Sequence, residues 1–227
     1  VKRLRPAELA SIDFKQENYT ALLWFFEGFT SYYDDLFLQR TGLIKQQTYL
    51  DLVAKTINQV AATPGRHIQS VAQASYDAWV KYYRVGENTP NATVSYYTKG
   101  ALIALCTDLL LRKRGSDLDT LMRTLWHRTS GGPMTEAMVS QSLHNLGFED
   151  VAVQLHEWVH TTEDLPIAAL LGDFGVSLKP KTAPLAQRLG LRVNERDGIR
   201  ITHVARGGAA EAAGMAAGDE WLALGCG

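Results

Sequence analysis

Apolar side chains recur every three or four residues through most of residues 19–161. This spacing is typical of helices that bury one face. Gly and Pro residues mark the breaks between the expected helices: Gly42, Pro64, Gly65, Gly115 and Gly147. The segment 94–111 is apolar on nearly every side, so we expect it to be the central buried helix.

The pattern changes after Pro166. Pro180 and Pro184 indicate a linker, and beyond them short β-like runs flank Asp197-Gly198, which is a hairpin signal. We therefore expect a mainly α-helical protein in three parts. These are a helical domain over residues 1–166, a linker over 167–185 and a small β-rich domain over 186–227.

Composition narrows the class of protein. Of the 227 residues, 46% are hydrophobic and 21% are charged, and the net charge is −1. The basic residues form no stripe, so we expect no nucleic-acid partner. No apolar run approaches the ~18 residues that cross a bilayer, so we expect no membrane partner. The chain begins with Val1 rather than Met, so its compartment, cytoplasmic or periplasmic, is not determined.

The pentapeptide His156-Glu157-Trp158-Val159-His160 matches the pattern HExxH. On a helix such histidines share a face and can bind zinc, with the glutamate as general base. A zinc site needs a third ligand, and Glu163 and Asp164 follow too closely, just before a helix-stopping Pro. We interpret the match as two surface histidines with a chance glutamate. The alternative is a compact zinc peptidase that uses these three residues.

Two other segments contain unexpected polar residues. Glu27 lies inside the aromatic run Trp24-Phe25-Phe26-Glu27-Gly28-Phe29. A buried carboxylate is costly unless it is paired or bound to a metal, so Glu27 is either satisfied by an Arg or backbone amides, or it is a ligand. Tyr97 lies in Ser95-Tyr96-Tyr97-Thr98-Lys99-Gly100, where the most apolar helix begins. Taken alone, Tyr97 is explained by packing.

Together, in the same order, the two segments resemble the W-x-x-E-G-F-x-x-Y and Y-x-K-G elements of the gluzincin metallopeptidases. More closely, the chain looks like the C-terminal part of the M61 family, the glycyl aminopeptidases. The opening Val1-Lys2-Arg3-Leu4-Arg5-Pro6 is similar to the residues that come after that family's HExxH-x-W-N. Other matching stretches are Thr30-Ser31-Tyr32-Tyr33-Asp34-Asp35, Thr63-Pro64-Gly65-Arg66, Asp77-Ala78-Trp79-Val80-Lys81-Tyr82-Tyr83 and Thr162-Glu163-Asp164-Leu165-Pro166.

The resemblance implies the helical C-terminal subdomain of a zinc aminopeptidase that removes small N-terminal residues, Gly or Ala, from a peptide substrate. It implies that Glu27 is the third zinc ligand and that Tyr97 donates a hydrogen bond to the oxyanion. Both histidine ligands and the general-base glutamate would lie before Val1. We therefore expect this chain alone to bind no zinc and to be inactive.

The tail resembles part of a bacterial PDZ module. Leu189-Gly190-Leu191 looks like its carboxylate-binding loop, which receives a C-terminal peptide ligand while the peptide adds as a strand. The chain ends at Gly227, roughly halfway through such a module, so we expect the groove to be incomplete. The alternative for the whole chain is a non-catalytic helical and PDZ-like protein-interaction module.

Overall fold

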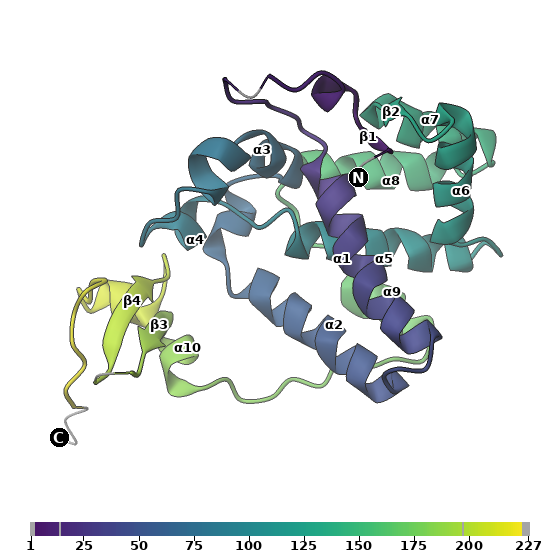
Figure 1. Cartoon of the computed structure of the whole chain (residues 1–227). Coiled ribbons are helices and arrows are strands. Elements are labelled where there is room, and N and C mark those ends of the chain that lie inside the picture. The colour runs from purple at the N-terminus through teal and green to yellow at the C-terminus, as the bar shows by residue number, and fades with distance from the viewer. Residues whose placement is uncertain (1–2, 14, 197, 224–227) are drawn as a thin grey trace.

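The computed structural model of the chain describes residues 3–13, 15–196 and 198–223. The chain is mainly helical, as predicted (Figure 1). Its longer helices are α1 (Leu23–Arg40), α2 (Gln46–Ala61), α5 (Thr98–Arg112), α6 (Leu118–Thr129), α7 (Glu136–Asn145) and α8 (Glu149–His160). Its shorter α-helices are α3 (Val71–Tyr76), α4 (Thr89–Ala92), α9 (Ile167–Gly172), α10 (Leu185–Leu189) and α11 (Ala209–Ala212). Its remaining elements are the 3₁₀ turns η1 (Ala7–Leu9) and η2 (Pro64–His67), the π-helix η3 (Ala78–Tyr82), and the strands β1 (Arg5–Pro6), β2 (Pro133–Met134), β3 (Leu191–Asn194) and β4 (Arg200–Val204).

Helix α5 is the central buried helix that the apolar segment 94–111 predicts. Its buried residues face several directions at once, and α1, α2, α6, α8 and α9 pack against it. Such an arrangement needs a helix that is apolar on nearly every side. The predicted breaks are also confirmed, since Gly42, Gly115 and Gly147 all adopt the left-handed conformation that ends a helix.

The crossing of α1 over α5 depends on two glycines. A Cβ atom at Gly28 would lie 2.6 Å from backbone atoms of Gly100, and a Cβ atom at Gly100 would lie 2.6 Å from the carbonyl oxygen of Trp24. Any larger side chain at either position would push the two backbones apart. The sequence elements W-x-x-E-G and Y-x-K-G therefore meet at their glycines.

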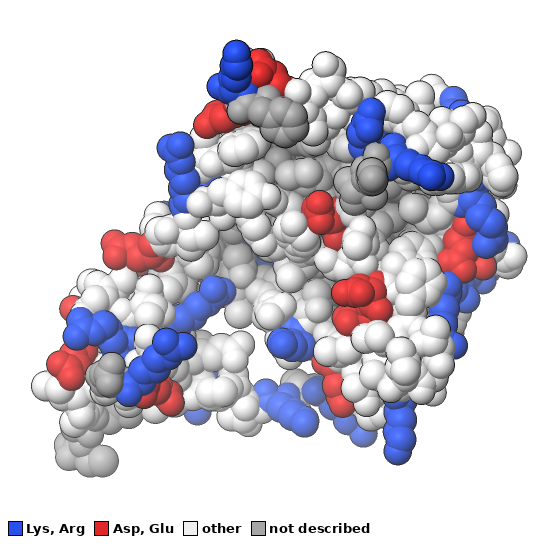
Figure 2. Space-filling view, in the orientation of Figure 1, with Lys and Arg blue, Asp and Glu red and all other residues white. Residues whose placement is uncertain are grey.

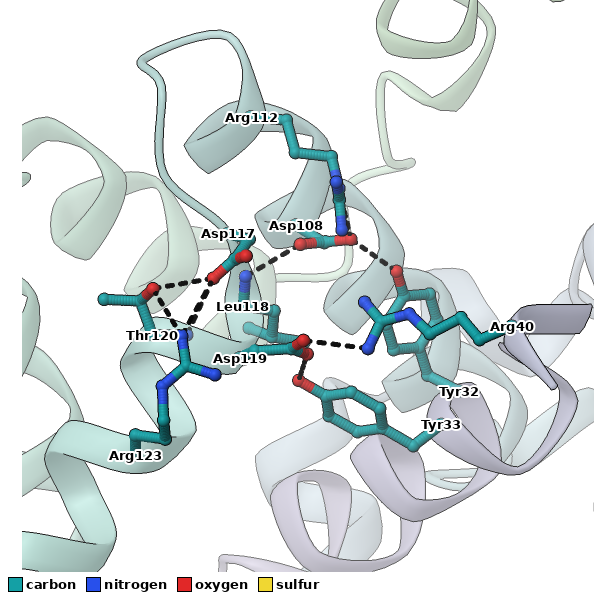
Figure 3. A network of polar contacts seen from close by, with 10 residues as sticks. All are labelled: Tyr32, Tyr33, Arg40, Asp108, Arg112, Asp117, Leu118, Asp119, Thr120 and Arg123. Carbon is teal, nitrogen blue, oxygen red and sulfur yellow. Dashed lines mark hydrogen bonds and ion pairs between the residues drawn. The ribbon is translucent and has the colours of Figure 1, made fainter. Parts of the chain in front are cut away.

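A polar network joins α1, α5 and α6 (Figure 3). The buried carboxylate of Asp108 accepts hydrogen bonds from the Tyr32 hydroxyl at 2.6 Å and from the Leu118 amide at 2.7 Å, and it pairs with Arg112. Burial and the neighbouring Asp108 charge raise the pKa of the Tyr32 phenol far above its usual range. A buried carboxylate with this many partners is satisfied, so the network fixes how α1 lies on α5.

Helices α7 and α8 form an antiparallel hairpin around Gly147. Helix α8 buries one side of its surface in the main core, namely Val151, Ala152, Leu155, Trp158 and Val159. This sets the rotation of α8 about its axis. The remaining residues of α8 face either solvent or the flank of α7.

The tail is a small separate unit at the end of an extended segment (Figure 1). The first six residues of the expected linker form α9, which packs on the main core, and residues 173–184 contain no helix or strand. Strands β3 and β4 pair antiparallel, as the hairpin signal predicts, although Asp197 lies outside the described residues. The tail has its own small hydrophobic cluster around Leu191, Ile201 and Ala210.

Polar contacts hold the tail against the helical part beside α4. The Asn91 side chain donates to the carbonyl of Val204 and accepts from the amide of Arg206. The His203 ring nitrogen Nδ1 lies 2.7 Å from the carbonyl oxygen of Glu87. A hollow separates the tail and the extended segment from α2 (Figure 2). In the described segments, no helix is both long and apolar enough to cross a bilayer.

Candidate active site

Glu27 is half-buried on α1, one turn after its first residue, Leu23. The aromatic residues around it, Trp24, Phe25, Phe26 and Phe29, are all buried in the main core. This packing fixes the rotation of α1, so the direction in which the Glu27 carboxylate points is set by the core. Within residues 3–13, 15–196 and 198–223, no basic side chain forms an ion pair with Glu27. The ion-pair explanation for this acid is therefore not supported.

Tyr97 lies beside Glu27, directly before the first residue of α5. Burial raises the pKa of the Tyr97 phenol to about 12, and the negative charge of Glu27 and a hydrogen bond to its carboxylate add to the shift. At neutral pH the phenol is therefore protonated and able to donate a hydrogen bond. The structure brings the two sequence-predicted residues together, across the crossing of Gly28 and Gly100.

Two other tyrosine rings pack against Tyr97. The rings of Tyr82, Tyr96 and Tyr97 pack together, with centroids 4.8 to 5.7 Å apart. Tyr96 is fully buried, whereas Tyr97 is half-buried. Tyr82 belongs to the π-helix η3, a rare form of helix that occurs frequently at functional sites. The sequence pattern did not assign Tyr82 to the site, and only its place in a stretch that resembles the M61 family points to it.

Lys99 has a different position from Tyr97. Its side chain is buried, and its ammonium group donates to the carbonyl of Glu163. Arg66 forms an ion pair with the neighbouring Asp164 at 2.9 Å. A Cβ atom at Gly65 would lie 2.2 Å from the carbonyl oxygen of Thr93, so this loop also needs a glycine. Lys99 and the loop from Thr63 to Arg66 thus hold the segment after α8 and do not face Glu27.

Side chains that could hold a metal ion gather away from Glu27. Among the described residues, one group of three ligating side chains exists, made of Glu136, His156 and His160. Glu27 belongs to no such group, so the residues present do not form a zinc site around it. The zinc chemistry that the resemblance implies at Glu27 would need ligands from outside these residues.

Glu136 supplies the third ligand that the HExxH match lacked in the residues downstream of it. Glu136 is the first residue of α7 and lies 11 residues before Gly147, whereas His156 and His160 lie 9 and 13 residues after it. In an antiparallel helical hairpin, residues equally far from the turn lie side by side. This symmetry about Gly147 could have identified Glu136 from the sequence.

The residues assigned to a carboxylate-binding loop form the junction of α10 and β3. Leu189 ends α10, Gly190 caps it with a φ of 81°, and Leu191 begins β3. The Gly190 amide donates to the carbonyl of Gln187, and the Gly190 carbonyl accepts from the amide of Ala205. The Gly190 amide is therefore already paired with the chain itself.

Comparison with known proteins gives one matching family model and a similar solved structure. Residues 1–103 match the family model described as M61 glycyl aminopeptidase. A crystal structure of an aminopeptidase N family protein from Idiomarina loihiensis is 34% identical, with a TM-score of 0.88 over 96% of this chain. This chain covers 40% of that one, so it spans less than half of the length of the solved structure. No curated protein gives a significant match.

Proposed function

We propose, on the premise that residues 1–103 belong to the M61 glycyl aminopeptidase family, that the chain is the helical part of a zinc-dependent aminopeptidase. Its substrate would be a peptide with a small N-terminal residue, Gly or Ala. Residues 1–166 would form the helical part of the peptidase domain. The observation that supports this best is the position of Glu27 beside Tyr97, in a crossing held by two glycines.

In this proposal Glu27 and Tyr97 have separate tasks. Zinc, when bound, polarises the scissile carbonyl and lowers the pKa of its water. Glu27 would supply one carboxylate oxygen to the metal, from a helix that the core holds in place. Tyr97 donates its phenol proton in a hydrogen bond to the oxygen that gains negative charge during attack. Burial raises the pKa of the Tyr97 phenol to about 12, so near neutral pH the phenol carries the proton that this hydrogen bond needs.

The remaining ligands belong to a histidine pair that, by the family resemblance, comes from a segment outside residues 1–227. The stretch Val1–Pro6 resembles the residues that follow this histidine pair in the family. Val1 and Lys2 of this stretch lie outside the described residues. On this proposal residues 1–227 are inactive by themselves, because they lack two ligands and the general base.

The test uses the full-length protein that contains this chain. We expect it to hydrolyse Gly and Ala anilides faster than Leu anilides, to lose this activity with a chelator and to regain it with zinc. Residues 1–227 alone, assayed in parallel, should release no aniline above background. Full activity after exhaustive chelation would contradict the zinc proposal, and absence of any aminopeptidase activity would contradict the assignment of function.

For the tail, we propose a partial PDZ-like module over residues 186–227, joined to the helical part by the segment 173–184, which contains no helix or strand. The order α10, β3, β4, α11 and the separate hydrophobic cluster support it. Since the Gly190 amide is already paired with the carbonyl of Gln187, we expect residues 1–227 to bind C-terminal peptides with no measurable affinity. Calorimetric titration with a hydrophobic C-terminal peptide tests this, and micromolar binding would contradict it.

A further inference from the structure

Glu136, His156 and His160 come together on one flank of the α7–α8 hairpin, and no part of the proposed peptidase mechanism uses them. One ligating atom from each residue lies within 4.8 Å of the other two. The His160 Nε2 atom lies 2.5 Å from the Glu136 Oε1 atom, and the His156 Nδ1 atom lies 3.7 Å from the same oxygen. The centroids of the two imidazole rings lie 4.3 Å apart, and the ring planes are tilted by 38°.

These distances are close to those of a bound transition metal. Zinc binds imidazole nitrogen and carboxylate oxygen at about 2.0–2.2 Å, so tetrahedral ligand atoms are roughly 3.3 Å apart. The two measured contacts, 2.5 and 3.7 Å, lie on either side of that value. The ring and the carboxylate that now share a hydrogen bond would move apart by less than an ångström to admit an ion.

The backbone already holds the three side chains near this arrangement. The histidines are four residues apart on α8, so they share a face. The buried residues of α8, with Trp158 between the histidines, fix that face against the flank of α7. Glu136 lies in the first turn of α7. A metal here would therefore join the start of α7 to the end of α8.

We propose that Glu136, His156 and His160 bind a divalent transition-metal ion, with zinc as the physiological candidate. Two imidazoles and one carboxylate suit zinc, copper and nickel, and exclude a site selective for calcium or magnesium, which prefer oxygen. This inference does not rest on the proposed peptidase function. It revises the expectation that residues 1–227 bind no zinc. That expectation did not include Glu136 as a third ligand beside the two histidines.

The site binds an ion but does not form a hydrolytic centre. The side chains of His156 and His160 are 69% and 37% exposed, on an open helical surface. Glu157, the acid of the HExxH match, accepts a hydrogen bond from Gln154 on the exposed side of α8. A peptidase must hold its substrate in a cleft that excludes bulk water. The open positions of the metal would be filled by water.

The test is a zinc titration of residues 1–227 after removal of metal by a chelator. We expect calorimetry to give about one zinc per chain, and cobalt in place of zinc to give the visible absorption of a tetrahedral or five-coordinate ion. Zinc should also raise the melting temperature by several degrees, because it binds the folded hairpin and not the unfolded chain. Absence of binding in the unaltered chain would overturn the proposal.

Matched variants identify the ligands. We expect the double variant His156→Ala with His160→Ala to abolish zinc binding. Glu136→Gln should weaken zinc binding on the order of tenfold or more, since mutation of a residue that only hydrogen-bonds a metal ligand already lowers metal affinity by that much. Glu157→Gln should bind as the unaltered chain does, because Glu157 lies on the exposed side of α8 and is not one of the three ligands. Unchanged affinity in the double-histidine variant, or an equal loss in Glu157→Gln, would overturn the assignment. All of these positions are exposed or half-buried, and melting curves without zinc verify folding.

Discussion

The two groups of candidate metal ligands in this chain are built in opposite ways. Glu27 and Tyr97 lie in a crossing of two buried helices, where glycine backbones touch, but the described residues supply only one ligand there. Glu136, His156 and His160 form a complete set of three ligands, but on an open surface. An HExxH match with a third ligand therefore does not by itself indicate catalysis. Rigid and partly dry surroundings are the better indicator of a hydrolytic site.

The comparison is tested most strongly at Glu27. In the full-length protein, Glu27→Gln should abolish turnover and lower zinc affinity at the proposed active site, because a charged ligand is replaced by a weaker neutral one. Asp34→Asn is the matched control, since Asp34 is an exposed acid on the same helix. Anilide hydrolysis and metal analysis measure both effects. If Glu27→Gln kept wild-type zinc and activity and lost only thermal stability, Glu27 would be a structural acid.

The next largest effect is expected at Tyr97. Tyr97→Phe removes one hydroxyl and keeps the packed ring, so zinc content, melting temperature and KM should change little. The value of kcat should fall by roughly 10²–10³, the usual cost of losing one oxyanion donor. Tyr96→Phe is the control, because Tyr96 is fully buried whereas Tyr97 is half-buried. Steady-state kinetics of both variants measure the effect. A large loss of kcat in Tyr96→Phe alone would mean that Tyr96, and not Tyr97, is the catalytic phenol.

Sequence reasoning predicted the helices well because their information is local. The apolar segment 94–111 and the glycines at 42, 115 and 147 identify α5 and the helix ends by periodicity and turn chemistry alone. The pairing of Glu27 with Tyr97 was different, since the two residues are 70 positions apart. Their neighbours Gly28 and Gly100 look like ordinary helical glycines until the backbones are seen to touch. Only the family resemblance linked the two segments.

The sequence pattern failed to predict two other features, because both depend on contacts between distant residues. Residues 167–172 were assigned to the linker because Pro166 interrupts the helical pattern, yet α9 buries three apolar residues in the core. Glu136 was missed because its partners approach it through a helical hairpin. Long-range packing of this kind leaves no pattern within a single window of sequence.

A third variant tests the crossing itself. In residues 1–227, Gly100→Ala should lower the free energy of unfolding by about 2 kcal/mol, because its Cβ atom would lie 2.6 Å from the Trp24 carbonyl oxygen and backbones cannot yield as side chains do. Gly172→Ala is the control, since nothing lies within 4 Å of its Cβ position and Ala is favoured in helices. Urea unfolding measures both. Equal stability of the two variants would show that the crossing tolerates a methyl group and that glycine is not required there.

The smallest effect separates Lys99 from Tyr97 within the same short element. Burial lowers the pKa of the Lys99 ammonium below its ordinary value of 10.5. Between the lowered pKa of the folded state and that of the unfolded state, the unfolded chain binds more protons, so stability rises with pH. Below this window the penalty of burying the charge is constant, and above it the penalty is absent. We therefore expect the stability of the unaltered chain, relative to Lys99→Met, to rise as pH increases toward 10.5. At neutral pH Lys99→Met should change stability by no more than ~1 kcal/mol, since an apolar side chain often replaces a buried charge without loss.

Urea unfolding at several pH values measures the difference, and the titration of all other groups cancels in the comparison. Lys45→Met, at an exposed position, should show no such slope. If Lys99→Met followed the unaltered chain at every pH, the ammonium would be solvated, and Lys99 would be free to act at the site instead of anchoring the carbonyl of Glu163.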